Sequence, residues 1–429
     1  MQQWYRKVVA FVVVSFFVSG CGGGSSLDEP SKVTLKGGEL IADFPANVIK
    51  EDLVEKKLIA PTQSVFGFRA YKVPYTTTDE EGKEVNASGV VVLPSTLGVS
   101  SEDAQKLQQM NQLGLSIVVD DHGTIFANKE APSVLIAETM MPEGAPIIFS
   151  SLAGFITMQP DYIGFGDSKE HYHPYLLKQS SATATVDFYK AAKKFIEDNN
   201  LAKLNSGIYL SGYSQGGYVA LAALKEFENE GITVNVTAPM AGPYLLDPIA
   251  QGVLSLDSIA VPSFMAAVAH AYATRYQKDS TTLIQEPYAS RLSELFDSKA
   301  YTREEIDKQL TTKVSGENGL FTDDIVQNYS GSWFQQVLQA NSVVDFAPTQ
   351  LVTLIHCQGD DVISYDVSVE TKKAFANYFD VEVDLVPVEI ALTGDPNTEL
   401  RYTHAECAPY AYSIASSIFA KDRKNTVGY

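Results

Sequence analysis

The sequence predicts a protein of the α/β class, in which a mostly parallel central sheet is flanked by helices and interrupted by an inserted helical cap. Three observations support this prediction. Short apolar runs alternate with amphipathic helical patterns, an antiparallel hairpin precedes them, and about 100 residues after the middle of the chain contain no clear strand. Such alternation is typical of parallel strands joined by helices. The apolar runs comprise residues 115–119, 155–158, 208–210, 234–236, 351–355 and 383–388.

The hairpin comes first along the chain. Residues 66–73 and 87–94 have strand character and flank a polar segment, 76–83, that contains a glycine. This arrangement predicts two antiparallel strands. Residues 182–197 and 216–230 repeat apolar side chains at helical spacing, so both are expected to be amphipathic helices.

The segment without a strand, residues 247–346, is rich in Ala, Leu and Tyr. A second independent domain is one interpretation of it, but the sheet pattern resumes afterwards, which favours a helical cap inserted into one core. The rest of the chain is expected to divide into a signal peptide at 1–20, a tether and N-terminal extension at 21–60, and a core made of 61–246 and 347–429. A chain of this length exceeds the usual single core, which agrees with an insertion.

The first residues read as an export signal. Arg6 and Lys7 precede an apolar run at 8–18 that is shorter than the ~20 residues of a membrane-spanning helix. Val18-Ser19-Gly20-Cys21 then resembles the lipobox at which bacterial lipoproteins are cleaved and acylated, which implies a lipid anchor on Cys21. The expected location is the bacterial cell envelope, with the outer membrane favoured. The alternative is an ordinary secreted protein.

The charge excludes one class of partner. The chain has 32 Lys and Arg against 52 Asp and Glu, and loss of Arg6 and Lys7 with the signal would leave 30 against 52, a net charge of −22. A protein so acidic is not expected to bind nucleic acid. The expected membrane contact is the lipid anchor alone.

The strongest motif is the G-x-S-x-G pattern Gly212-Tyr213-Ser214-Gln215-Gly216. It lies between a strand-like run and an amphipathic helix, as required for a nucleophilic serine on a sharp strand-to-helix turn. The two glycines let strand and helix approach, and the backbone N–H of Gln215 at the helix start can bind an oxyanion. A glycine-rich helix start with an exposed serine is the plainer interpretation.

A serine needs a histidine to remove its proton, and in this arrangement the chain order is serine, acid, histidine. His270, His356 and His404 follow Ser214. His270 falls in an expected cap helix and His356 ends an apolar run. His404 precedes a helical pattern at 410–420, the position expected of the base, although a loop histidine at the surface would look the same.

The acid is expected in residues 356–364, HCQGDDVIS. This segment resembles the H-G-x-x-D-x-x-V-P loop of many α/β-hydrolases, in which His356 and Asp360 match, whereas Cys357 replaces glycine and Ser364 replaces proline. The departures leave the geometry of the loop open.

The register of that loop favours Asp360 over its neighbour Asp361 as the orienting acid. Asp247 is a lesser rival, because some α/β-hydrolases draw their acid from the preceding strand. The second oxyanion donor is expected in the His-Gly-x pattern of residues 122–124, through the backbone N–H of Thr124. A tight polar turn is the alternative for that segment.

Two further segments, residues 159–168 and His173-Pro174-Tyr175-Leu176, resemble the bacterial relatives of the secretory lipase family. The resemblance covers most of residues 66–429 except the cap. It implies an α/β-hydrolase fold and an esterase or lipase that cleaves a small-molecule or lipid ester without a cofactor. The residues alone specify acyl transfer through serine, so a serine peptidase remains an alternative. A lipoprotein that uses the scaffold only for binding is a less favoured one.

Two cysteines other than Cys21 flank the expected acid and base. Contact of Asp360 with His404 would bring Cys357 and Cys407 together, which in an exported protein favours a disulfide over two buried thiols. No H-E-x-x-H motif or clustered His and Cys spacing predicts a metal site.

Overall fold

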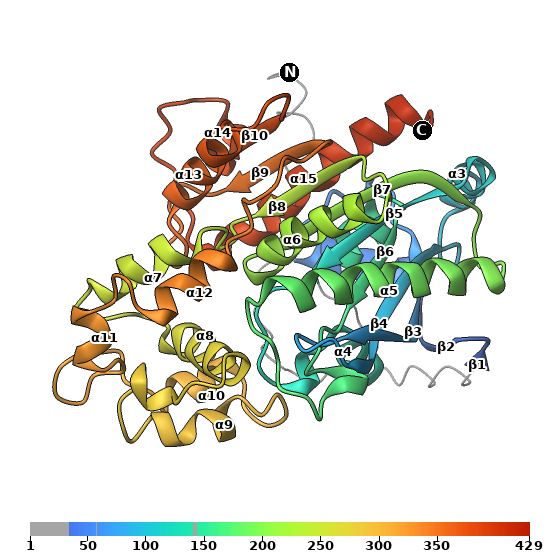
Figure 1. Cartoon of the computed structure of the whole chain (residues 1–429). Helices are drawn as coiled ribbons and strands as arrows, with labels where there is room; N and C mark the ends of the chain where they lie inside the picture. Colours follow the sequence, from blue (N-terminus) through green and yellow to red (C-terminus); the bar gives the residue numbers. More distant parts are fainter. Residues whose placement is uncertain (1–33, 57, 140–143) are drawn as a thin grey trace.

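A computed structural model describes residues 34–56, 58–139 and 144–429. The expected signal peptide and Cys21 lie outside the described residues. Figure 1 shows the sheet with helices on both faces and a group of short helices gathered to one side of it. Among the described residues, no helix is both long and apolar enough to cross a membrane.

The centre of the fold is a ten-stranded sheet in the order β1-β2-β3-β4-β6-β5-β7-β8-β9-β10. The last six strands of this order, β6-β5-β7-β8-β9-β10, run parallel to one another. Strands β1 to β4 pair antiparallel, and β4 joins the parallel part by pairing antiparallel with β6. The parallel strands are β5 (Leu115–Asp121), β6 (Ile156–Pro160), β7 (Leu204–Tyr213), β8 (Val236–Met240), β9 (Leu351–His356) and β10 (Val383–Pro387). The mostly parallel sheet predicted from the alternating apolar runs is therefore confirmed.

The antiparallel part begins earlier than the sequence suggested. The expected hairpin is formed by β3 (Gly67–Thr78) and β4 (Glu84–Ser95), but β1 (Thr34–Leu35) and β2 (Gly38–Phe44) extend the sheet beyond β3. Phe44 is buried and stacks on Phe68 of β3, so burial of this aromatic pair explains why the strand joins the core. Strands β1 and β2 both lie within residues 21–60, which the sequence assigned to the tether and N-terminal extension. Helix α2 (Ala46–Glu55) also lies within this range.

Successive side chains of a parallel strand point to opposite faces of the sheet, so they pack into two apolar layers, each covered by helices. In β5, Ile117 and Val119 pack in the layer under α5 (Lys178–Asp198) and α6 (Gln215–Asn229), whereas Val118 packs in the opposite layer, which includes α15 (His404–Thr426). The other helices of the core are α3 (Ser101–Leu113), α4 (Pro132–Thr139), α13 (Tyr365–Phe375) and α14 (Val388–Thr393).

The chain between β8 and β9 carries six α-helices and no strand of the sheet. They are α7 (Leu246–Leu254), α8 (Pro262–Arg275), α9 (Leu292–Leu295), α10 (Arg303–Asp307), α11 (Asp323–Gln327) and α12 (Trp333–Ala340), drawn from yellow-green to orange in Figure 1. Helix α8 is tied to the core: the Tyr272 hydroxyl donates to the Leu176 carbonyl at 2.8 Å, and Arg275 pairs with Glu81 of the β3–β4 turn at 2.9 Å.

Candidate active site

Ser214 lies on the sharp turn between β7 and α6. Its φ of 59° falls in the left-handed region, which non-glycine residues rarely adopt. The turn is possible because glycines lie two residues before and two residues after Ser214. A Cβ on Gly216 would overlap the Asp121 carbonyl oxygen, and a Cβ on Gly212 would overlap the backbone of Gly216. The side chain of Ser214 is therefore held at the start of α6 and at the end of the central strands.

Gln215 is the first residue of α6, so its backbone N–H has no partner within the helix. Its side chain contacts His173, with 2.9 Å between the two Nε2 atoms, and His173 Nδ1 donates to the Ile163 carbonyl at 2.8 Å. Burial lowers the pKa of His173 to about 4, so the ring is neutral and its Nε2 accepts from the Gln215 amide. This chain of hydrogen bonds fixes the residue that follows Ser214.

Asp360 follows β9, and its side chain is fully buried. Its Oδ1 accepts hydrogen bonds from the backbone N–H groups of Val362 and Ile363 at 2.9 and 2.8 Å, and its Oδ2 lies 2.6 Å from His404 Nδ1. Burial alone would raise the pKa of Asp360, but hydrogen bonds and charge from His356 and His404 outweigh burial and lower the pKa well below its ordinary value. Asp360 is therefore ionised at neutral pH and paired with the His404 ring.

His404 is the first residue of α15, and contacts on two sides hold its backbone. Its N–H donates to Asp361 Oδ1 at 2.9 Å, and its carbonyl accepts from the Tyr213 hydroxyl at 2.6 Å. The Tyr213 and His404 rings lie 4.9 Å apart. Because Tyr213 immediately precedes Ser214, these contacts place His404 against the residue next to the expected nucleophile. The His404 side chain is 13% exposed, which leaves it accessible.

The rival residues lie elsewhere or contact other atoms. Asp361 bonds the backbone of His404 and not its ring. Asp247 lies in α7, where it accepts from Tyr329 and Gln339. His270 lies within α8, as its helical surroundings suggested, with its ring stacked on a phenylalanine.

Cys357 and Cys407 form a disulfide with a Cα–Cα distance of 5.9 Å. Cys357 is three residues before Asp360, and Cys407 is three residues after His404. The bridge therefore joins the loop that carries the acid to the helix that begins with the histidine.

The loop after β5 passes close to the same turn. A Cβ on Gly123 would lie 3.4 Å from the Tyr213 carbonyl oxygen, and Thr124 Oγ1 lies 2.8 Å from the Tyr175 hydroxyl. The His122 ring packs against the Tyr162 ring in a tilted arrangement, with 4.0 Å between the ring centroids, and burial lowers the pKa of His122. The segment thus runs beside the Ser214 turn, and the His122 ring packs on Tyr162.

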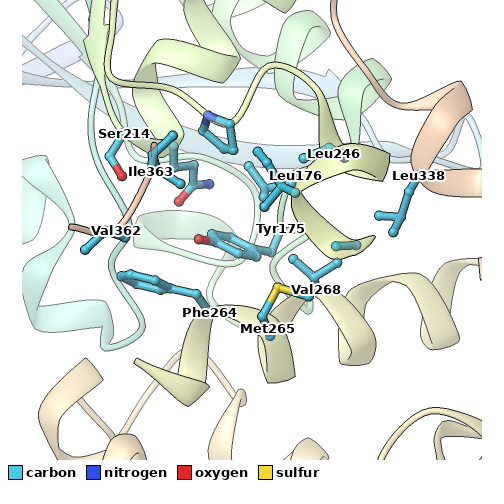
Figure 2. Close-up of a pocket in the computed structure, with 14 residues that line it drawn as sticks. Tyr175, Leu176, Ser214, Leu246, Phe264, Met265, Val268, Leu338, Val362 and Ile363 are labelled. Atoms are coloured by element: carbon cyan, nitrogen blue, oxygen red, sulfur yellow. The ribbon is translucent and has the colours of Figure 1, made fainter. Parts of the chain in front are cut away.

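An apolar pocket that is partly open to solvent is lined by Ser214. Figure 2 shows Ser214, Val362 and Ile363 on one side of it, Leu338 on the opposite side, and Phe264, Met265 and Val268 of α8 along its edge. The pocket thus joins the core to the inserted helices. Its lining residues are Tyr175, Leu176, Ser214, Gln215, Pro243, Leu246, Ile249, Ala250, Phe264, Met265, Val268, Leu338, Val362 and Ile363.

Sequence reasoning missed two features near the site. One is the contact of His356 Nε2 with Asp360 Oδ2 at 3.2 Å, to which the four-residue spacing of the acid loop could have pointed. The other is the pair of buried carboxyls, Asp120 and Asp121, at the end of β5. Burial raises the pKa of both, that of Asp120 to about 7. Within the described residues, no group of three His, Cys, Asp or Glu side chains is arranged to hold a metal ion.

Solved structures with the same architecture were found at low sequence identity. A candidate hydrolase from Legionella pneumophila has a TM-score of 0.76 and 20% identity, over 92% of this chain and 99% of its own. The rice cell wall degrading esterase LipA from Xanthomonas oryzae has a TM-score of 0.72 and 21% identity, over 93% and 98%. Candida antarctica lipase A has a TM-score of 0.56 and 13% identity, over 93% and 91%.

No protein-family model matches the chain, and no curated protein matches its sequence. The likeness of the chain to known proteins is therefore one of structure: the order and direction of the strands, the strand-to-helix turn at Ser214, and the agreement over nine-tenths of the chain with three solved structures. On these grounds the chain has the α/β-hydrolase fold that its motifs predicted.

Proposed function

We propose that the protein hydrolyses carboxylic esters through an acyl-enzyme on Ser214, with His404 as general base and acid and Asp360 as the orienting acid. The observation that carries the proposal is the 2.6 Å contact between His404 Nδ1 and the buried, ionised carboxylate of Asp360. The Tyr213 hydroxyl, next to Ser214 in the chain, holds the backbone of His404. A carboxylate on Nδ1 leaves Nε2 free to take a proton and stabilises the imidazolium that forms.

In this mechanism Ser214 Oγ attacks the ester carbonyl carbon while His404 Nε2 takes the hydroxyl proton. The backbone N–H groups of Gln215 and Thr124 would bind the developing oxyanion. The tetrahedral intermediate then collapses, the C–O bond to the alcohol breaks, and His404 gives its proton to the departing alcohol. Water attacks the acyl-enzyme by the same route in reverse, which releases the carboxylic acid and restores the Ser214 hydroxyl.

The pocket supports an ester with an apolar acyl group. None of its lining side chains is charged, and most are aliphatic or aromatic. Such a lining favours an acyl chain of a small-molecule or lipid ester over a polar or charged group. The esterase and lipase activities named for the LipA and lipase A structures agree with this proposal.

The decisive experiment measures hydrolysis of p-nitrophenyl esters by the purified protein and by Ser214→Ala. Loss of a serine nucleophile typically lowers kcat on the order of 10⁶-fold, and Ser101→Ala, an exposed serine at the start of α3, is the matched control. Ester hydrolysis at the wild-type rate by Ser214→Ala would refute the proposal. Faster cleavage of peptide amides than of esters would favour a serine peptidase.

The proposed location is the bacterial cell envelope, through a lipid on Cys21. The support is the lipobox-like Val18-Ser19-Gly20-Cys21, followed by a run of Gly and Ser residues of the composition typical of a tether. Cys21→Ala should move the protein from the membrane fraction to the soluble fraction of cells, whereas Ser25→Ala should not. A Cys21→Ala protein that stays with the membranes would contradict the anchor.

A further inference from the structure

Asp360 has a second histidine on the oxygen that contacts His404. Oδ2 lies 2.6 Å from His404 Nδ1 and 3.2 Å from His356 Nε2, while Oδ1 takes the two backbone N–H groups of the same loop. A carboxylate offers about four acceptor positions, so these four donors occupy it completely. His356 itself is fully buried at the end of β9.

The contacts of His356 determine where its proton lies. Nε2 faces only acceptors, Asp360 Oδ2 at 3.2 Å and the Ile363 carbonyl at 3.0 Å, so it must carry a hydrogen. Nδ1 lies 2.7 Å from Ser368 Oγ, a hydroxyl that can donate to it. In the neutral ring Ser368 therefore donates to Nδ1, and the Nε2–H is shared between the carboxylate and the carbonyl.

We propose that His356 is a positioning residue, which fixes the Asp360 carboxylate toward His404 and lowers the basicity of the His404 ring. Two imidazole N–H groups share one oxygen, so each receives less of its negative charge than it would alone. The His404 imidazolium is then less stabilised than it would be beside an undivided carboxylate. The catalytic consequence, a base that is free to act at lower pH, rests on the proposed function.

Other groups around His404 do not duplicate this effect. Asp361 contacts the backbone of His404, and Tyr213 contacts its carbonyl. Glu389 of α14 accepts from the N–H groups of Gln358 and Gly359. Of the hydrogen bonds found in the described parts of the chain, only that of His356 shares Oδ2 with the His404 ring.

The test compares two amides at position 356. The amide nitrogen of His356→Gln occupies about the place of Nε2 and can still donate to Asp360, whereas that of His356→Asn lies near the place of Nδ1 and cannot. The pKa of the His404 ring is measured by NMR of histidine-labelled protein, with its signal assigned by its loss in His404→Gln. The expected result is a pKa raised by roughly half to one unit in His356→Asn and an unchanged pKa in His356→Gln.

Ser368→Ala is the control for packing, because it removes the partner of Nδ1 and leaves the contact with Asp360 in place. It should leave the His404 pKa unchanged. An unchanged pKa in a folded His356→Asn protein, or equal shifts in the Asn and Gln variants, would overturn the inference.

The acid limb of kcat/KM against pH should follow the NMR values in every variant. If the wild-type protein cleaves no ester while the NMR shifts occur as expected, the proposed function fails and the positioning of His404 through Asp360 stands. The two proposals therefore fail separately.

Discussion

Asp360 and Asp361 are adjacent carboxylates with different tasks, and exchanging each for its amide separates them. Asp360→Asn removes the charge beside His404 Nδ1 and should lower kcat for ester hydrolysis about 10⁴-fold, as the same change does in a serine protease with such a triad on another fold. Asp361→Asn alters only a bond to the backbone of His404 and should cost less than about 10-fold, because an amide oxygen can still accept it. Steady-state kinetics with a short-chain ester measures both. Equal losses would show that the register of the acid loop is wrong.

At the scale of single residues, the sequence predicted what a motif encodes and missed what only folding brings together. Ser214 and Asp360 followed from spacing within one segment, and His404 from its order in the chain. The contact between His356 and Asp360 was missed, because the four-residue spacing between the end of β9 and the acid loop is compatible with it but does not fix the directions of the two side chains. The contact of Gln215 with His173 joins segments 42 residues apart, and no pattern signals it.

Among the elements, helix α8 should control the length of the acyl chain. Val268 faces the pocket from this helix, so Val268→Trp should fill space that a long chain needs and leave a short chain room. The ratio of kcat/KM for octanoyl over acetyl ester should fall roughly 10-fold or more, since each buried methylene contributes ~1–3 kcal/mol. The matched control is Thr274→Trp on the exposed side of α8. An unchanged ratio in Val268→Trp would place the acyl chain elsewhere.

The disulfide links two elements and should stabilise the fold through the loop that it closes. Cys357 and Cys407 are 50 residues apart, for which the chain-entropy model gives about 4 kcal/mol. The double variant Cys357→Ser/Cys407→Ser should therefore unfold at a lower guanidinium concentration. Its free energy of unfolding should be lower than that of the wild-type protein by about this amount or less. Dithiothreitol should lower the stability of the wild-type protein but not that of the double variant. If reductant affects both equally, the bridge does not contribute.

Element boundaries show where periodicity suffices and where it does not. The central strands are buried on both faces and appear as continuous apolar runs, so β5 and β9 were predicted to within two residues. Strand β2 was missed because its residues are mostly half-buried and carry a weak alternation. The strand expected at 234–236 is observed as Val236–Met240, because Pro239 breaks the apolar pattern without ending the strand.

For the whole molecule, the class of fold was predictable and the arrangement of its parts was not. Alternating strands and helices specify a parallel sheet, but the order β4-β6-β5-β7 depends on crossovers that composition does not encode. The inserted helices were expected as a cap, but which of their side chains line the pocket was not predictable. Their apolar side chains, such as Phe264 and Met265, would have fitted any buried interface equally well.

The buried carboxyl of Asp120 should make global stability fall as the pH rises toward neutrality. Burial raises its pKa from 3.8 to about 7, despite hydrogen bonds from Ser211, Gln159 and Tyr412. Between these two values the folded protein binds a proton that the unfolded chain has lost, so the free energy of unfolding decreases with increasing pH. At about 1.4 kcal/mol for each unit of pKa, the loss is no more than about 4 kcal/mol.

Asp120→Asn tests this dependence, because the amide is neutral at every pH and nearly isosteric with the protonated acid. Relative to wild type, the variant should become progressively more stable between about pH 4 and 7, and the difference should level off above about pH 7. Urea unfolding at several pH values measures it. Asp384→Asn, an exposed aspartate at the sheet edge, should follow the wild-type curve because its surroundings change little on unfolding. If the unfolding free energy of Asp120→Asn also depends on pH as that of the wild type does, Asp120 keeps its charge inside the folded protein, and the hydrogen bonds from Ser211 and Gln159 outweigh the effect of burial.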